Sequence, residues 1–192
     1  VSDIVNATID QADALMLSAE TAMGEYPVEV IKQMANISCA DQKFSKEHEI
    51  LHQTQADCDA TRILALNGCQ VAVDLLAKAM VVYTEKGRTA LFASMQKMHL
   101  PIYALSQQKK TCLRLNILHG IIPVCVDFSG HQVSSLNRLA VETLTKQMHI
   151  SDPDTVVILK GDLVGVSGHT NSLEVWTVAD LLKVHESLIG HM

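Results

Sequence analysis

Aromatic side chains, positive charge and long apolar runs are all scarce in this chain of 192 residues. Aromatic residues make up 4% of the sequence, and acidic residues outnumber basic ones by 21 to 15. A protein that binds nucleic acid needs cations for the phosphates and aromatic rings for the bases, so we expect no nucleic-acid partner. No apolar run approaches the roughly 20 residues of a membrane span, so we expect no membrane partner either.

The cysteines are scattered along the chain. The chain contains Cys39, Cys58, Cys69, Cys112 and Cys125. Their number is odd and no C-x-x-C spacing occurs, which favours core thiols in a reducing, cytoplasmic compartment over a disulfide framework. No signal peptide is visible and the first residue is Val1 rather than Met, so we interpret the sequence as a fragment or a processed chain.

The apolar fraction of 48% is enough for a sizeable core, and apolar runs alternate with amphipathic segments. This alternation predicts an α/β fold with a mostly parallel five-stranded sheet and helices on both faces. Pro123 places the third strand at an edge or at a strand start, and the alternating fifth strand is typical of an antiparallel edge. The expected strands are 79–83, 101–105, 121–126, 154–159 and 173–178, and the expected helices are 59–78, 88–97, 110–118, 134–149 and 179–189.

The N-terminal part has a different organisation. It predicts a short helix at 2–11, an apolar strand at 12–17, a polar loop, and a helix that begins near Pro27 and runs to about residue 43. Residues 44–57 are polar and charged, and we place the main domain boundary there.

One metal motif occurs in that polar stretch. His48-Glu-Ile-Leu-His52 matches H-E-x-x-H, which on a helix could bind zinc with Glu49 as the base. The stretch lacks a strong apolar helical face and a third ligand downstream, so a linker is the better interpretation and no metal site is predicted.

The most informative stretch joins the first expected strand of the sheet to the following helix. Its residues are Thr84, Glu85, Lys86, Gly87, Arg88 and Thr89. The two threonines offer hydroxyl groups, the glycine allows close approach to the backbone, and the two cations and the first helical amides attract an anion. The pattern indicates a phosphate site, although many α/β proteins make the same turn with nothing bound.

A second stretch begins with the expected strand at 12–17 and continues through Ser18, Glu20, Gly24 and Pro27. An apolar strand, a polar turn and a helix opened by proline are typical of the catalytic end of a (β/α)8-barrel strand. Spacing alone leaves a generic strand-to-helix loop as the favoured alternative.

Five motifs, taken together and in order, resemble the pyruvate kinase family. Met16-Leu-Ser-Ala-Glu-Thr-Ala-Met-Gly-Glu-Tyr-Pro27 resembles M-L-S-[GA]-E-T-A-x-G-x-[YF]-P, and residues 1–13 resemble the segment that precedes it. Residues 84–89 resemble the family's T-x-S-G-[RK]-[ST] effector loop. Residues 120–124 resemble G-[VI]-x-P-[VI], and residues 167–172 resemble S-G-x-T-N-[TS]. The match covers about residues 1–178.

The resemblance implies a division of the chain into three parts. Residues 1–44 would be the end of the catalytic barrel, including its last strand and helix, 45–178 the regulatory C-terminal domain, and 179–192 an additional helix or tail. The parent reaction would transfer a phosphoryl group from phosphoenolpyruvate to ADP, a step of glycolysis. Mg²⁺ and K⁺ would act in the full-length enzyme through ligands absent from this chain, so we expect no metal or cofactor on the chain itself. Among catalytic residues, the resemblance carries over Ser18 and Glu20 alone, and the isolated chain is expected to be inactive.

The resemblance also implies an effector site and a homotetramer. The effector-binding residues would be Thr84, Glu85, Lys86, Gly87, Arg88, Thr89, Ser167, Gly168, His169 and Thr170. Lys86 replaces the usual serine of the loop, and Thr84-Glu85 and Ser18-Ala19-Glu20 are more similar to the bacterial subgroup that answers to AMP and sugar monophosphates. The alternative is a stand-alone ligand-binding module without an enzyme, which residues 1–44 disfavour because such a module does not need a barrel strand.

Overall fold

The computed structural model describes residues 1–42, 59–128, 133–147, 150–162, 168–181 and 183. The chain divides into two compact units, residues 1–49 and 50–192, and each is considered by itself. The H-E-x-x-H stretch, the expected linker and Ser167 lie outside the described residues. The boundaries drawn from the sequence at 44 and 178 stay predictions.

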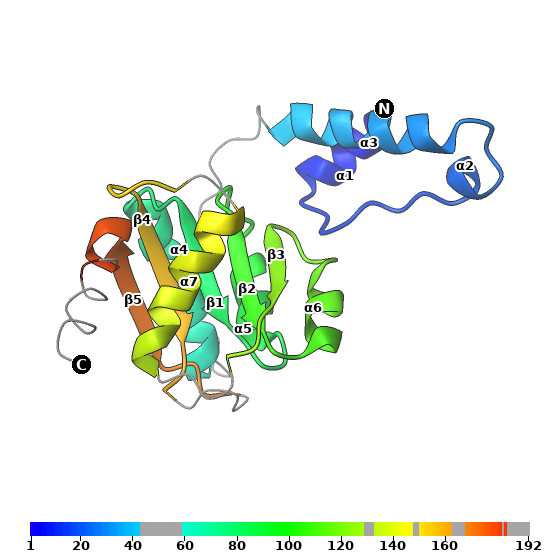
Figure 1. Ribbon diagram of the computed structural model, residues 1–192. Helices are drawn as coiled ribbons and strands as arrows, with labels where there is room; N and C mark the ends of the chain where they lie inside the picture. Colours follow the sequence, from blue (N-terminus) through cyan, green and yellow to red (C-terminus); the bar gives the residue numbers. More distant parts are fainter. Residues whose placement is uncertain (43–58, 129–132, 148–149, 163–167, 182, 184–192) are drawn as a thin grey trace. The chain divides into compact units, whose positions relative to one another are not determined.

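The first unit is helical in its described part. It contains α1 (Ser2–Ile9), α2 (Ala19–Ala22) and α3 (Pro27–Gln42), and α1 packs on α3 (Figure 1). Helix α3 begins at Pro27, as expected, because proline at the first helical position loses no hydrogen bond. The single turn α2 lies within the segment expected to be a polar loop, and the sequence analysis missed it.

The strand expected at 12–17 is not formed, since these residues have no regular secondary structure. A strand is held by backbone hydrogen bonds to a neighbouring strand, and the described residues of this unit offer only helices and turns. Met16 and Met23 accordingly remain 87% and 85% exposed. The segment is apolar, but the described residues of this unit include no strand that could pair with it.

The second unit contains the predicted five-stranded sheet, in the order β3-β2-β1-β4-β5. Strands β1 to β4 pair in parallel, while β5 is antiparallel to β4 and lies at one edge (Figure 1). Strand β3, with Pro123, lies at the other edge, so both edge predictions are confirmed. The strands are β1 (Ala79–Tyr83), β2 (Ile102–Ser106), β3 (Ile121–Cys125), β4 (Thr155–Lys160) and β5 (Ser172–Thr177).

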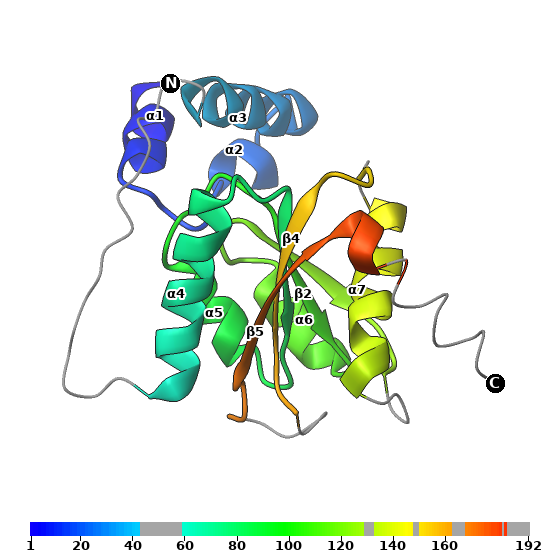
Figure 2. The same ribbon diagram turned by 90° about the vertical axis from the view of Figure 1, so that its left-hand side faces the viewer.

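Helices cover both faces of this sheet, as predicted. Figure 2 shows α4 and α5 on one side and α7 on the other. The core divides accordingly, because alternate residues of a strand point to opposite faces: Met80 and Val82 pack with α4, α5 and α6, whereas Val81 and Tyr83 pack with α7. The helices are α4 (Ala60–Asp74), α5 (Arg88–Ser94), α6 (Lys109–Leu115) and α7 (Val133–Gln147).

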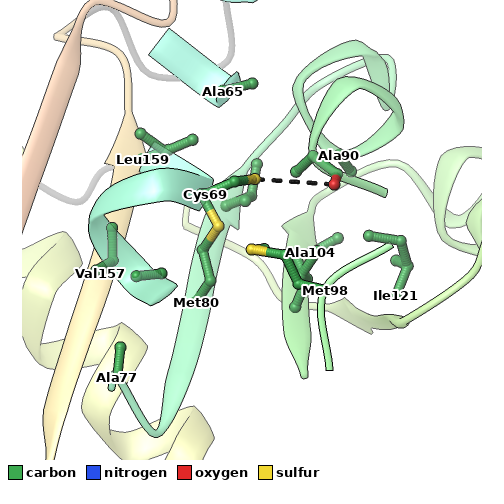
Figure 3. Packing of buried hydrophobic residues seen from close by; sticks show 14 of the residues in the cluster. Ala65, Cys69, Ala77, Met80, Ala90, Met98, Ala104, Ile121, Val157 and Leu159 are labelled. Carbon is green, nitrogen blue, oxygen red and sulfur yellow. Dashed lines mark hydrogen bonds between the residues drawn. The ribbon is translucent and has the colours of Figure 1, made fainter. Parts of the chain in front are cut away.

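Cys69 belongs to the first of these two core layers (Figure 3). Its thiol donates to the carbonyl oxygen of Ala93 at 3.8 Å, and burial raises the pKa of Cys69 to about 12. A protonated sulfur packed among alanine, methionine and leucine side chains is an inert core thiol. Cys112 is buried as well, but Cys39 and Cys125 are exposed, so the prediction of core thiols is wrong for these two.

Three helices end earlier than expected. Helix α4 ends at Asp74 instead of 78, α5 at Ser94 instead of 97, and α6 at Leu115 instead of 118. Lys97 adopts a φ of 48°, which no α-helix continues through. The expected helix at 179–189 is helical at residues 178–181 and 183, and the rest lies outside the described residues.

Candidate functional site

The order in which the chain adds strands to the sheet reverses between β1 and β4. From β1 the chain adds β2 and β3 on one side and then returns to add β4 on the other, so the loops that follow β1 and β4 leave the sheet side by side. In open α/β sheets this position, at the carboxyl ends of the strands, is where ligands bind. The two segments predicted from the sequence, 84–89 and 167–170, follow these two strands.

The loop after β1 is folded by its own threonine. The backbone amide of Thr84 donates to the carbonyl oxygen of Leu105 on β2, and its Oγ1 accepts the amide hydrogen of Gly87 at 3.0 Å. The first backbone hydrogen bond of α5 then runs from Leu91 to the Gly87 carbonyl. The Thr84 hydroxyl therefore holds the loop, and its hydrogen remains available as a donor.

Gly87 is required by the backbone and by packing. Its φ is +87°, a conformation that residues with a side chain rarely adopt. A Cβ atom there would also lie 3.1 Å from Cδ2 of Leu115 on α6. Helix α6 thus closes against the loop, which explains this glycine even without a ligand.

A hydroxyl pair joins the two loops. The Oγ1 atoms of Thr89 and Thr170 are 2.7 Å apart, and both residues are buried. In such a pair one hydroxyl donates to the other, and the second keeps its hydrogen for a further acceptor. The structure therefore brings together two predicted residues that are 81 positions apart in the sequence.

The two cations of the loop have different environments. Arg88 forms an ion pair with Asp59, the N-cap of α4, and its guanidinium lies 5.3 Å from the centre of the Phe92 ring. Lys86 is exposed, and among the described residues it forms no ion pair. Lys86 is therefore the cation of this loop that remains available to an anionic ligand.

Glu85 is held by residues that the sequence analysis did not single out. Its carbonyl oxygen accepts from Oγ1 of Thr111 at 2.9 Å and from Oγ of Ser106 at 3.5 Å, and its Oε1 accepts from Gln108 at 2.8 Å. Its Oε2 atom is buried and has no hydrogen-bond partner within the described part of the chain. These partners lie 21 to 26 positions away, at the end of β2 and the start of α6, so no local pattern could reveal them.

Hydrogen bonds join the two ends of the loop that follows β4. The amide of Asn171 donates to the Lys160 carbonyl at 3.2 Å, and its side chain exchanges hydrogen bonds with Asp162. A Cβ atom on Gly161 would lie 2.3 Å from the carbonyl oxygen of His169, so the two ends of the loop are in contact. His169 itself is exposed.

Ser18 and Glu20 lie in one turn of the first unit. The Ser18 amide donates to Oε2 of Glu20 at 3.0 Å, and hydrogen bonds from the backbone of Glu20 itself and of Ser18 lower the pKa of Glu20. Both side chains are exposed. The predicted pair is thus adjacent, with an ionised carboxylate at neutral pH.

Gly24 of the same motif is fixed by contact with this turn. A Cβ atom there would lie 2.1 Å from the carbonyl oxygen of Glu20, a distance that no side chain tolerates. The glycine therefore allows the chain to pass close behind the Ser18–Glu20 turn before α3 begins.

Metal ligands are not clustered in the described part of the chain. No group of three histidine, cysteine, aspartate or glutamate residues there could hold a metal ion. Within the same residues, no helix is both long enough and apolar enough to cross a membrane.

Comparison with known families adds to this geometry. The family described as "Pyruvate kinase, alpha/beta domain" matches residues 63–176. The chain belongs to the pyruvate kinase family. A second description, "Pyruvate kinase, barrel domain", matches residues 1–31, which include Ser18 and Glu20. The α/β match includes both loops of the candidate site.

Relatives in this family are moderately similar to the chain. A pyruvate kinase of Buchnera aphidicola is 34% identical over 180 residues, which is 93% of this chain and 37% of the relative. Pyruvate kinase II of Salmonella typhimurium is 32% identical with the same coverage, and a pyruvate kinase of Staphylococcus epidermidis is 30% identical over 99% of this chain and 34% of its own length. The chain thus spans little more than a third of these relatives.

Proposed function

We propose that the chain is part of a cytoplasmic pyruvate kinase that transfers a phosphoryl group from phosphoenolpyruvate to ADP. Family membership and the paired Ser18 and Glu20 support this proposal. In the complete enzyme Mg²⁺ and K⁺ would neutralise phosphate charge, and the described residues contain no cluster of three histidine, cysteine, aspartate or glutamate side chains that fits a metal ion. Alone, the chain should give no pyruvate above background in an assay coupled to lactate dehydrogenase.

The function that the geometry of this chain supports best is binding of a phosphorylated effector. The observation that carries it is the meeting of the two loops at the switch of the sheet, joined by Thr89 and Thr170. A dianionic phosphate needs several donors and compensation for its lost hydration. The Thr84 hydroxyl and the free hydrogen of the Thr89–Thr170 pair would supply donors, and Lys86 would supply the charge.

Other predicted residues would act on the shape of the site. Arg88 would orient the start of α5 through Asp59. Gly87 would give the turn, and Glu85, fixed by its partners on β2 and α6, would hold the loop in register. Gly168 and His169 would lie near the sugar, since a Cβ atom on Gly168 would meet no described residue within 4 Å; the role of Ser167, which lies outside the described residues, rests on the motif alone.

The charge of Glu85 also bears on effector choice. A carboxylate with one unpartnered oxygen next to the loop adds negative charge, which disfavours a second phosphate nearby. We therefore propose a sugar monophosphate or AMP rather than a bisphosphate.

Calorimetry tests both the position of the phosphate site and the preference for a monophosphate. AMP, ribose 5-phosphate and glucose 6-phosphate should be compared with fructose 1,6-bisphosphate, on the parent chain and on Lys86→Ala, with Lys146→Ala as the control because Lys146 is exposed on α7. A monophosphate should bind best, and Lys86→Ala alone should weaken it. Equal binding by both variants would place the site elsewhere, and preference for the bisphosphate would overturn the effector class.

We also propose that the full-length protein assembles as a homotetramer. Strand β5 is an edge of the sheet, with Val175 42% exposed, and Ile63 on α4 is 47% exposed. Such an edge and apolar side chains favour contact with a second copy. Sedimentation equilibrium of the full-length protein tests this, and a monomer would contradict it.

A further inference from the structure

Two cysteine side chains converge on the loop that follows β2. The thiol of Cys112, on α6, donates to the Ser106 carbonyl at 3.7 Å, and the thiol of Cys125, the last residue of β3, lies 3.9 Å from the Gln107 carbonyl. Strand register places Ser106 directly opposite Cys125. Thus two sulfur atoms approach consecutive carbonyl groups of one short loop, from a helix and from a neighbouring strand.

These two thiols differ in accessibility. Cys125 is exposed and Cys112 is buried. Burial, together with a hydrogen bond and charge from the Cys125 thiol, raises the pKa of Cys112 to about 11. The two thiols are therefore neighbours at this loop, with Cys125 accessible to a reagent and Cys112 shielded from it.

We propose that Cys112 and Cys125 are a redox-active thiol pair that closes to an intrachain disulfide when the protein meets hydrogen peroxide. The exposed Cys125 sulfur would attack one peroxide oxygen and break the O–O bond, which gives a sulfenic acid and the first water molecule. The Cys112 sulfur would then attack the Cys125 sulfur, forming the S–S bond, breaking the S–O bond and releasing a second water. In sum, two thiols are oxidised and one peroxide is reduced to two waters.

The bond would tie α6 to β3, and α6 supports the loop of residues 84–89. Thr111, next to Cys112, holds the Glu85 carbonyl, and Leu115 lies against Gly87. Oxidation should therefore slow hydrogen exchange of the Gly87 amide, which is bonded within this loop.

Peptide mapping by mass spectrometry tests the pairing in the full 192-residue chain. After treatment with hydrogen peroxide, the peptides that contain Cys112 and Cys125 should be linked, and dithiothreitol should release them. The Cys125→Ser variant should lose the link, whereas Cys39→Ser, which changes an exposed thiol in the other unit, should keep it. In concentrated urea the five thiols should pair without this preference.

Three outcomes would overturn the proposal. The first is oxidation of Cys125 to sulfinic acid while Cys112 stays a free thiol. The second is linkage of Cys125 to Cys39 or Cys58 as often as to Cys112. The third is the same pairing pattern in urea as in buffer, since proximity in the fold would then play no part. Circular dichroism of each serine variant separates these results from unfolding.

Discussion

The Lys160 ammonium lies 2.9 Å from a carboxylate oxygen of Glu174, and the lysine side chain is only 4% exposed. The lysine also donates to Oδ1 of Asn137 at 2.6 Å, and Glu174 accepts from Asn137 and from the indole of Trp176. These residues link β4, β5 and α7 at the base of the loop that carries Thr170. The network satisfies a buried cation on β4 with oxygen acceptors on two other elements, β5 and α7.

Removing one member of this network should be costly. Lys160→Met would leave the Glu174 carboxylate half-buried with its cation gone, and we expect a loss of about 3 kcal/mol in the free energy of unfolding. Urea denaturation followed by fluorescence of Trp176, the one tryptophan of the chain, measures this. The matched control is Lys183→Met, because that lysine is exposed and its one ion pair among the described residues, with Asp180, is long at 3.9 Å. Equal stability of the two variants would show that the network contributes nothing.

The same pair predicts a pH dependence. Burial alone would raise the pKa of Glu174, but hydrogen bonds from Lys160, Trp176 and Asn137, with the lysine charge, outweigh it and lower the pKa. Because the folded pKa lies below the unfolded one, the stabilisation is complete above the unfolded value and is lost as the pH falls through the folded value. Unfolding free energies of the parent and Glu174→Gln should therefore converge as the pH is lowered from 7 to 3. A constant difference between the two proteins would contradict this assignment.

Two glycines with the same backbone conformation allow packing to be separated from strain. Gly87 and Gly168 have φ values of +87° and +82°, but a Cβ atom meets Leu115 at the first and open space at the second. Each change to alanine should cost about 1 kcal/mol through the left-handed conformation, and Gly87→Ala should cost more because Leu115 must move. Thermal unfolding of both variants checks this, and equal shifts in the melting temperature would mean that α6 does not press on the loop.

The sequence predicted those features whose causes are local or periodic. Alternating apolar segments were enough for the sheet and both its faces, and Pro123 was enough for one edge. Thr84 and Gly87 were recognisable because a strand, a polar turn and a helix follow one another directly. The pairing of Thr89 with Thr170 could be expected only from strand order, which places two distant loops together.

Other features depend on partners that a sequence does not reveal. Residues 12–17 are apolar and read as a strand, yet no neighbouring strand is described in their unit. Lys160 at a strand end resembles any solvated lysine until Asn137 on α7 is placed beside it. Glu85 was predicted to be an effector ligand from its place in a motif, and its contacts with Thr111 and Gln108 are set by the packing of α6.

The hydroxyl pair at the junction of the loops gives the sharpest test of the effector site. In Thr170→Val the shape is kept, but the hydroxyl of Thr89 loses the buried partner that orients it, so the pair no longer holds a donor toward a phosphate. We expect effector binding to weaken by about 1 to 3 kcal/mol, the usual cost of an unmade hydrogen bond to a charged group. The control is Thr145→Val, because Thr145 is exposed on α7 and bonds only within its own helix. Calorimetry with ribose 5-phosphate measures the difference, and urea denaturation shows whether the loss is one of binding or of folding. If Thr170→Val binds ribose 5-phosphate as tightly as Thr145→Val while both remain folded, the Thr89–Thr170 pair only connects the two loops and the phosphate does not contact it.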